Sequence, residues 1–185
     1  MAALHPDLAR LVDVNSANLR RAEALVADLT PAQFNWRSDP GRWSIGQNIA
    51  HLNIITGGED EIIAQAIERA HARGLTGNGP YRYGFMSRWF VKSMELPVKR
   101  KFKAPKYFQP PPDTDPVKTL DEYRRNSARL AELIKLANGL DLVRAKTHFV
   151  KPSWVRIPLG ARFALITTHD RRHLWQAEQV RAQLK

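Results

Sequence analysis

The sequence predicts an all-α protein: a four-helix bundle with a long crossover between its second and third helices. Four long segments carry apolar residues at steps of three and four, which is typical of amphipathic helices. We find no convincing strand pattern, and a stretch of different composition, residues 74–115, separates the second helical segment from the third. A length of 185 residues suits one domain, so we expect residues 1–185 to form a single domain.

The first two helical segments are joined by a short connection. The first covers residues 4–29, and the Thr-Pro pair that follows it indicates a short helical turn. Ser44 is a good N-cap for the second helix, which we expect to continue to about Ala72. The pair Gly57-Gly58 lies inside that helix and marks a weak point or a close approach by a neighbour.

The crossover begins with a glycine-rich stretch and ends soon after three successive prolines. Inside it we expect one short helix, from Phe85 to Met94. Pro116 begins the third helix, and the pair Asn138-Gly139 closes it. The third helix therefore follows the second only after a long surface connection, as in bundles whose neighbouring helices run parallel.

A second connection, residues 140–157, precedes the last helix. Its residues 148–150 are β-like in composition, but we expect them to be only extended. Pro158 then opens the last helix, which we expect to run to Leu184.

The amino-acid composition limits the kinds of site and partner that the protein can have. The chain contains no cysteine, which excludes disulfides, cysteine-bound metals and a cysteine nucleophile. The sequence has neither a signal-peptide pattern nor an apolar stretch of ~20 residues, so we expect a cytoplasmic protein. A formal net charge of +11 is compatible with nucleic acid, an anionic membrane or an acidic small molecule as partner.

Three histidines form a candidate metal site. His169 and His173 lie four residues apart on the last helix, so both imidazoles can reach one ion. Ile166 and Ala177 share their helical stripe, which turns the pair inward. Without further ligands, the pair has an alternative interpretation that involves no metal: one histidine hydrogen-bonded in the core and one exposed neighbour. His51, near the apolar face of the second helix, completes an open three-histidine set typical of catalytic metals.

Two motifs carry a resemblance to a known family. They read WSIGQ at residues 43–47, followed by His51, and HDRRH at residues 169–173. In order and spacing they resemble the DinB-like superfamily across nearly the whole chain. The resemblance implies a four-helix bundle with its crossover after the second helix, and it places the metal ligands at His51, His169 and His173. The crossover, unusually basic and aromatic, departs from this pattern.

The resemblance also implies an activity. Characterised members of the superfamily transfer a small thiol to an electrophile or perform a thiol-dependent isomerisation. It therefore implies a metal-dependent enzyme with a divalent ion, for which we expect zinc or nickel, and a low-molecular-weight thiol such as glutathione or bacillithiol. Members are often dimers, which implies a homodimer acting on a small-molecule substrate.

Other residues near the motifs have open roles. The second motif also resembles the zinc-protease pattern His-Glu-x-x-His, with Asp170 at the position of the general base but one methylene shorter. We favour a role in which Asp170 binds an arginine or orients a histidine. Candidate pocket residues, chosen for nearness to the motifs, are Tyr81, Tyr83 and Trp175. We expect the remaining histidines at the surface: His5, His71 and His148, the last of which could line an entrance.

Residues 88–106 form a basic segment with seven Lys or Arg and one Glu, interleaved with aromatic residues. It could bind nucleic acid through phosphate contacts and stacking, or an anionic membrane through an apolar stripe that starts at Phe85. We favour a third interpretation, in which the stripe packs on the bundle as a lid. The alternative to an enzyme is a stress-related protein that binds nucleic acid, anionic lipid or a partner through this segment, with a structural or vestigial metal.

Overall fold

In the computed structural model, which describes residues 3–97 and 104–184, the chain is mostly helical and has one small two-stranded sheet. The prediction of an all-α protein is therefore correct for the helices, although it missed the sheet. The elements follow in this order: α1 (Pro6–Val26), α2 (Pro31–Asn35), α3 (Ile45–Gly57), α4 (Asp60–Ala72), α5 (Phe85–Met94), the 3-10 helix η1 (Lys106–Phe108), α6 (Pro116–Leu136), β1 (Lys146–His148), β2 (Arg156–Pro158) and α7 (Leu159–Arg181).

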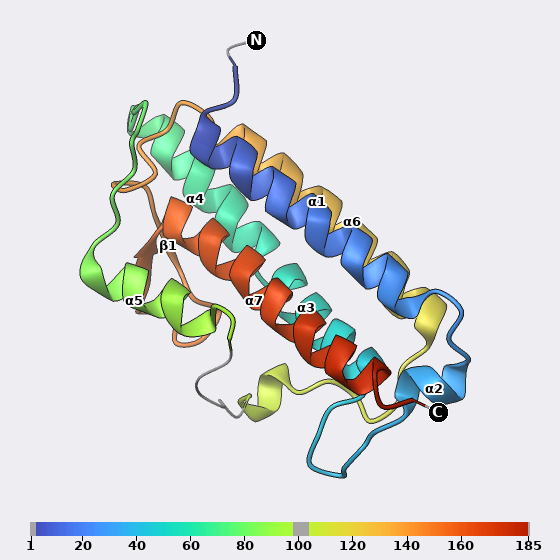
Figure 1. Cartoon of the computed structure of the whole chain (residues 1–185). Coiled ribbons are helices and arrows are strands. Elements are labelled where there is room, and N and C mark those ends of the chain that lie inside the picture. The colour runs from blue at the N-terminus through green and yellow to red at the C-terminus, as the bar shows by residue number, and fades with distance from the viewer. Residues whose placement is uncertain (1–2, 98–103, 185) are drawn as a thin grey trace.

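The long helices lie side by side (Figure 1). Both α1 and α3 pack against α6 and α7. In Figure 1, α1 and α7 run in one direction, while α3, α4 and α6 run in the other. Because α4 and α6 run the same way, the chain between them must return along the molecule. It does so through α5 and η1, so the predicted crossover is a feature of the fold.

The expected second helix is in fact two helices. The prediction of one helix continuing to Ala72 was wrong, because the helix ends at Gly57 and a new helix begins at Asp60. At the break the side chain of Glu59 turns inward and forms an ion pair with Arg162 of α7. Both side chains are buried. The break therefore allows a charged residue at this point of the chain to reach a partner in the interior.

Several predicted boundaries agree with the structure. Ser44 caps α3 in a capping box with Gln47. The short turn expected after the first helix is α2, which has a capping box of its own. Helix α5 covers Phe85–Met94 as predicted, and α6 begins at Pro116. These boundaries depend on residues close in sequence, which explains why they could be predicted.

Residues 148–150, in the connection before α7, were expected to be only extended; this was wrong for His148, which is the last residue of β1. Strands β1 and β2 form an antiparallel ribbon in which Thr147 lies opposite Ile157. These two side chains are buried, while Lys146 and Arg156 are exposed. The ribbon packs against α4 and the start of α7. Three-residue strands are too short for a two-residue alternation to reveal them.

The interior is divided between apolar clusters at the two ends of α7. One gathers α4, α6 and the first half of α7 around residues such as Phe163. Another gathers α2, α3 and the second half of α7 around Phe34 and Leu174. Helix α3 is buried over most of its length, and it brings polar side chains, Asn48 and His51 among them, into the interior. None of the helices in the described residues combines the length and hydrophobicity that crossing a bilayer requires.

Candidate metal centre

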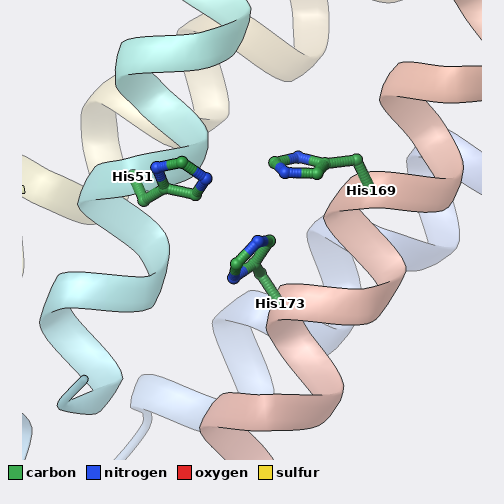
Figure 2. A group of neighbouring side chains, drawn as sticks. All are labelled: His51, His169 and His173. Carbon is green, nitrogen blue, oxygen red and sulfur yellow. The ribbon is translucent and has the colours of Figure 1, made fainter. Parts of the chain in front are cut away.

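The three predicted histidines come together between α3 and α7. His51 lies in the middle of α3, and His169 and His173 lie one turn apart on α7. Figure 2 shows the three rings directed into one common space between the two helices. The ring centroids are 4.5 to 5.2 Å apart, and one nitrogen from each ring lies within 4.8 Å of the other two. This group could hold a metal ion.

A carbonyl of the crossover fixes the tautomer of His51. Its Nδ1 lies 2.7 Å from the backbone oxygen of Phe108, in η1. A carbonyl oxygen can only accept a hydrogen bond, so Nδ1 carries the proton and donates it. In a neutral ring this leaves the lone pair of Nε2 available to a ligand.

The amide of Asn48 acts on His173 in the same way. Oδ1 of Asn48 lies 3.1 Å from Nδ1 of His173. The amide is oriented independently, because its Nδ2 donates to the backbone oxygen of Ser44 at 2.9 Å. With the amide nitrogen engaged there, the oxygen faces His173 and accepts the proton of Nδ1. His173 therefore also has Nε2 as its unprotonated nitrogen.

The unsatisfied ring nitrogen of His169 supports the presence of a metal ion in this group. Nδ1 of His169 is buried and has no hydrogen-bond partner among the described residues. Burying an unsatisfied polar nitrogen costs about 1–3 kcal/mol, and coordination of an ion by the imidazole is one way to give this ring its missing interaction. His169 is half-buried as a residue, whereas His51 and His173 are buried. Three neutral imidazoles suit a divalent metal ion.

The surroundings keep these histidines neutral. Burial lowers the pKa of His169 to about 3, and the positive charge of Arg172 adds to the effect. Burial likewise lowers the pKa of His173 well below its usual value, and it lowers the pKa of His51 against the opposing effect of the Phe108 carbonyl. Neutral imidazole is the form that binds metals. The protein environment therefore favours the ligand form of all three.

A family model describes most of the chain. The model of the DinB superfamily matches residues 16–177, a span that includes all three histidines. The chain belongs to the DinB superfamily. No curated protein and no solved structure matches it.

Three further residues contact the histidines of the candidate site. Trp43 belongs to a motif identified in the sequence, but the sequence indicated no role at the site for Trp43, Asn48 or Phe108. The Trp43 ring lies 4.7 Å from that of His51 and 5.6 Å from that of His173, measured between centroids. Asn48 and the carbonyl of Phe108 hold the two rings. Asn48 lies on the same helix as His51, three residues before it, which was a usable signal. Phe108 acts through its backbone, so its side chain gave none.

The Asp170 side chain is directed towards α6, and within the described residues no hydrogen bond joins it to any of the three histidines. Its Oδ2 accepts a hydrogen bond of 3.1 Å from the hydroxyl of Tyr123, on α6. Its Oδ1 has no hydrogen-bond partner among the described residues. Burial raises the pKa of Asp170 to about 7. The hydrogen bond that the structure shows therefore links α7 to α6, and it orients no histidine.

The other candidate pocket residues lie elsewhere. The Tyr81 hydroxyl donates to the backbone oxygens of Gly77, between α4 and α5, and Leu140, after α6. Tyr83 packs in an apolar cluster with residues of β2 and the start of α7. Trp175 follows His173 by two residues, which turns it roughly 200° around the helix. Closeness to the motifs in the sequence therefore did not identify residues that contact the three histidines.

The crossover reaches the site at two points. Phe108 binds His51, and the backbone oxygen of Ser93, in α5, accepts a hydrogen bond of 3.1 Å from Arg172. One face of α5 also packs on β2 and α7, through Phe90 and Met94. The apolar stripe predicted for this helix is therefore only partly packed on the bundle. Its other members are exposed: Phe85, Met86 and Trp89. Part of the basic segment, residues 98–103, lies outside the described residues.

Proposed function

We propose that this member of the DinB superfamily is a four-helix-bundle metalloenzyme that transfers a small thiol to an electrophile. His51, His169 and His173 would hold a divalent ion, zinc or nickel. The observation that carries the proposal is the convergence of three neutral imidazoles from two helices, two of them with fixed tautomers and the third with an unsatisfied buried nitrogen.

The ion would supply Lewis acidity, which favours the thiolate form of a bound thiol near neutral pH. The residues of the chain prepare the site for it. Phe108 and Asn48 hold two rings in their ligand tautomers, and Trp43 packs against both rings. In the overall reaction the thiol loses its proton to solvent, and its sulfur forms a bond to an electrophilic carbon. The leaving group departs from that carbon with the bonding electron pair.

The half-buried His169 and the basic crossover support an acidic thiol such as glutathione or bacillithiol. His169 is the least buried of the three residues, and the crossover contacts His51 through Phe108 and Arg172 through Ser93. Basic side chains near a ligand site attract acidic ligands. Such thiols are abundant in the cytoplasm, which is where we place the protein, and we expect it to act as a homodimer.

Elemental analysis of protein purified without a polyhistidine tag tests the metal site. Wild type should contain close to one zinc or nickel per chain, and the double variant His169→Ala/His173→Ala should contain almost none. The next step is an assay of glutathione or bacillithiol with an alkylating electrophile, compared between the two proteins. Absence of metal from wild type, even after reconstitution with zinc, nickel and manganese, would rule out this mechanism.

A second candidate function is suggested by α5. Three large apolar side chains of this helix are exposed: Phe85, Met86 and Trp89. Arg88 and Lys92 lie on the same helix, which contains no acidic residue. This composition suits a helix that lies in the surface of an anionic membrane. Sedimentation with anionic vesicles, compared between wild type and Met86→Ser/Trp89→Ser, tests it.

A further inference from the structure

A second feature of the molecule, away from the histidines, is a hollow between α4 and the β1–β2 ribbon. Its volume is about 90 Å³. Five of its nine lining residues are cationic, and none is acidic. The cations are Arg69, Arg73, Arg144, Lys146 and Arg156. The remaining lining residues are Ala66, Ala70, Leu75 and Ala145.

Helix α4 provides one wall of the hollow. Arg69 and Arg73 lie one helical turn apart, so their side chains leave the same face of the helix. Ala66 and Ala70 belong to that face and are buried. Alanines leave space where larger residues would fill it, so a recess forms between the arginines and the ribbon.

The opposite wall comes from the ribbon and the residues before it. Lys146 pairs with Pro158, and Arg156 pairs with His148, so Lys146 and Arg156 are diagonal neighbours on the exposed face of the ribbon. Such neighbours lie roughly 7–8 Å apart. Arg144 precedes β1 and is also exposed. These three cations line the same hollow as Arg69 and Arg73 of α4.

The plain alternative is that these are ordinary solvated cations. The dipole of α4 favours positive charge at its C-terminal end, which accounts for Arg69 and Arg73. It does not account for the charges on the ribbon. None of the five takes part in an ion pair within the described part of the chain. Glu68, which precedes Arg69 directly, takes part in none of these ion pairs either. Asp141, three residues before Arg144, accepts hydrogen bonds from the backbone nitrogens of Val143 and Arg144.

We propose that this hollow binds a small anion carrying phosphate groups. Bringing five positive charges together without a counter-charge is unfavourable, and a polyvalent anion relieves the repulsion. Guanidinium groups match phosphate oxygens with paired hydrogen bonds, and four of the five cations are arginines. The small volume admits one or two phosphate groups, so the rest of a larger ligand lies outside it. The site does not depend on the metal.

Calorimetric titration of wild-type protein with pyrophosphate, at constant ionic strength, tests the proposal. The variant Arg73→Gln/Arg144→Gln removes one cation from each wall, and its Kd should rise at least about tenfold. The matched control is Lys118→Gln/Arg125→Gln, which removes the same charge from exposed positions of α6 and should change Kd by less than about twofold. Because pyrophosphate also binds metals, His51→Ala is titrated in parallel and should retain the wild-type affinity.

Three results would overturn the proposal. The first is no binding at millimolar pyrophosphate. The second is equal weakening in the pocket variant and the α6 control, which would mean general electrostatic attraction. The third comes from vesicles carrying phosphoinositide headgroups: binding to these without binding to free pyrophosphate would contradict a small soluble ligand. Thermal unfolding of each variant verifies that it is folded.

Discussion

Oδ1 of Asn48 accepts a hydrogen bond of 3.1 Å from Nδ1 of His173, and this contact joins α3 to α7 within the candidate metal centre. The amide cannot rotate freely, because its nitrogen is engaged by the carbonyl of Ser44. One residue thereby connects the capped start of α3 with the tautomer of a histidine on another helix. The metal affinity of the site should therefore depend on Asn48, although its amide need not contact the ion.

Replacement of Asn48 by alanine tests this dependence. The Nδ1–H group of His173 would lose its acceptor, and the ring could then turn or adopt the other tautomer. Loss of such a supporting hydrogen bond typically lowers metal affinity about 10–100-fold. Competition with a chromophoric zinc chelator measures the change. Asn53→Ala is the matched control, because Asn53 is also buried on α3 but donates to the carbonyl of Thr119; its affinity should stay near that of wild type.

Removal of the metal should lower thermal stability. An ion that binds only the folded chain stabilises it by about 2.7 kcal/mol when present at 100 times its Kd. We therefore expect a chelator to lower the Tm of wild type and to leave the Tm of His51→Ala nearly unchanged. Differential scanning calorimetry with and without chelator makes the comparison. An equal drop in both proteins would mean that the ion binds elsewhere.

The three histidines could be predicted because their signals are local. The four-residue spacing of His169 and His173 and the capped helix start before His51 are visible in the sequence alone. The partners of these side chains come from distant segments and are not visible there. The carbonyl of Phe108 and the hydroxyl of Tyr123 reach α3 and α7 only after the helices pack.

The two main errors in predicting the fold have different physical causes. The apolar pattern continues through Gly57, and it gives no sign that Glu59 turns inward to a partner more than a hundred residues away. The strands β1 and β2 are held together by each other and by the helices beneath them. Each strand has only three residues, too few for an alternating pattern to reveal it.

A close approach at the start of α3 predicts a second substitution effect. A Cβ atom added at Gly46 would lie 2.5 Å from Cε1 of Phe34, a fully buried ring of α2, and it would also meet the hydroxyl of Thr114. Overpacking of this kind destabilises by about 1–3 kcal/mol. Urea unfolding of Gly46→Ala should show this loss. Gly57→Ala is the control, because its added Cβ meets nothing nearer than 3.8 Å, at Asn126.

The buried ion pair of Glu59 and Arg162 should behave differently from a surface pair. With both side chains almost fully buried, Glu59→Gln leaves the guanidinium without a counter-charge and should destabilise by about 3–5 kcal/mol. The double variant Glu59→Leu/Arg162→Met removes both charges and should be more stable than Glu59→Gln. Urea unfolding provides the values.

The exposed pair Arg129–Glu132 provides the reference for this comparison. Its two side chains retain 43% and 64% of their accessible surface. Glu132→Gln should therefore change the free energy of unfolding by no more than about 1 kcal/mol. If Glu59→Gln had an effect as small as Glu132→Gln, the buried pair would contribute nothing beyond an exposed one.

Asp60, the first residue of α4, should make the stability depend on pH. Burial raises the pKa of its carboxyl, against the opposing charge of Arg129. Its Oδ1 is buried without a hydrogen-bond partner among the described residues. A carboxyl whose pKa is higher in the folded chain than in the unfolded chain favours folding at low pH. This contribution is fully present below the usual value of 3.8 and is lost as the pH rises through the raised pKa.

The variant Asp60→Asn lacks this titration, so the sign of its effect can be stated. Relative to wild type, it should gain stability as the pH rises from 4 to neutrality, because only wild type must then ionise a carboxyl that the fold disfavours in its charged form. Urea unfolding of both proteins at several pH values, in chelator to keep the metal content equal, measures the difference. Asp13→Asn, at an exposed position of α1, reports the general effect of removing one carboxylate. A difference between wild type and Asp60→Asn that stayed constant, or shrank towards neutral pH, would show that burial does not hold the Asp60 carboxyl in its neutral form.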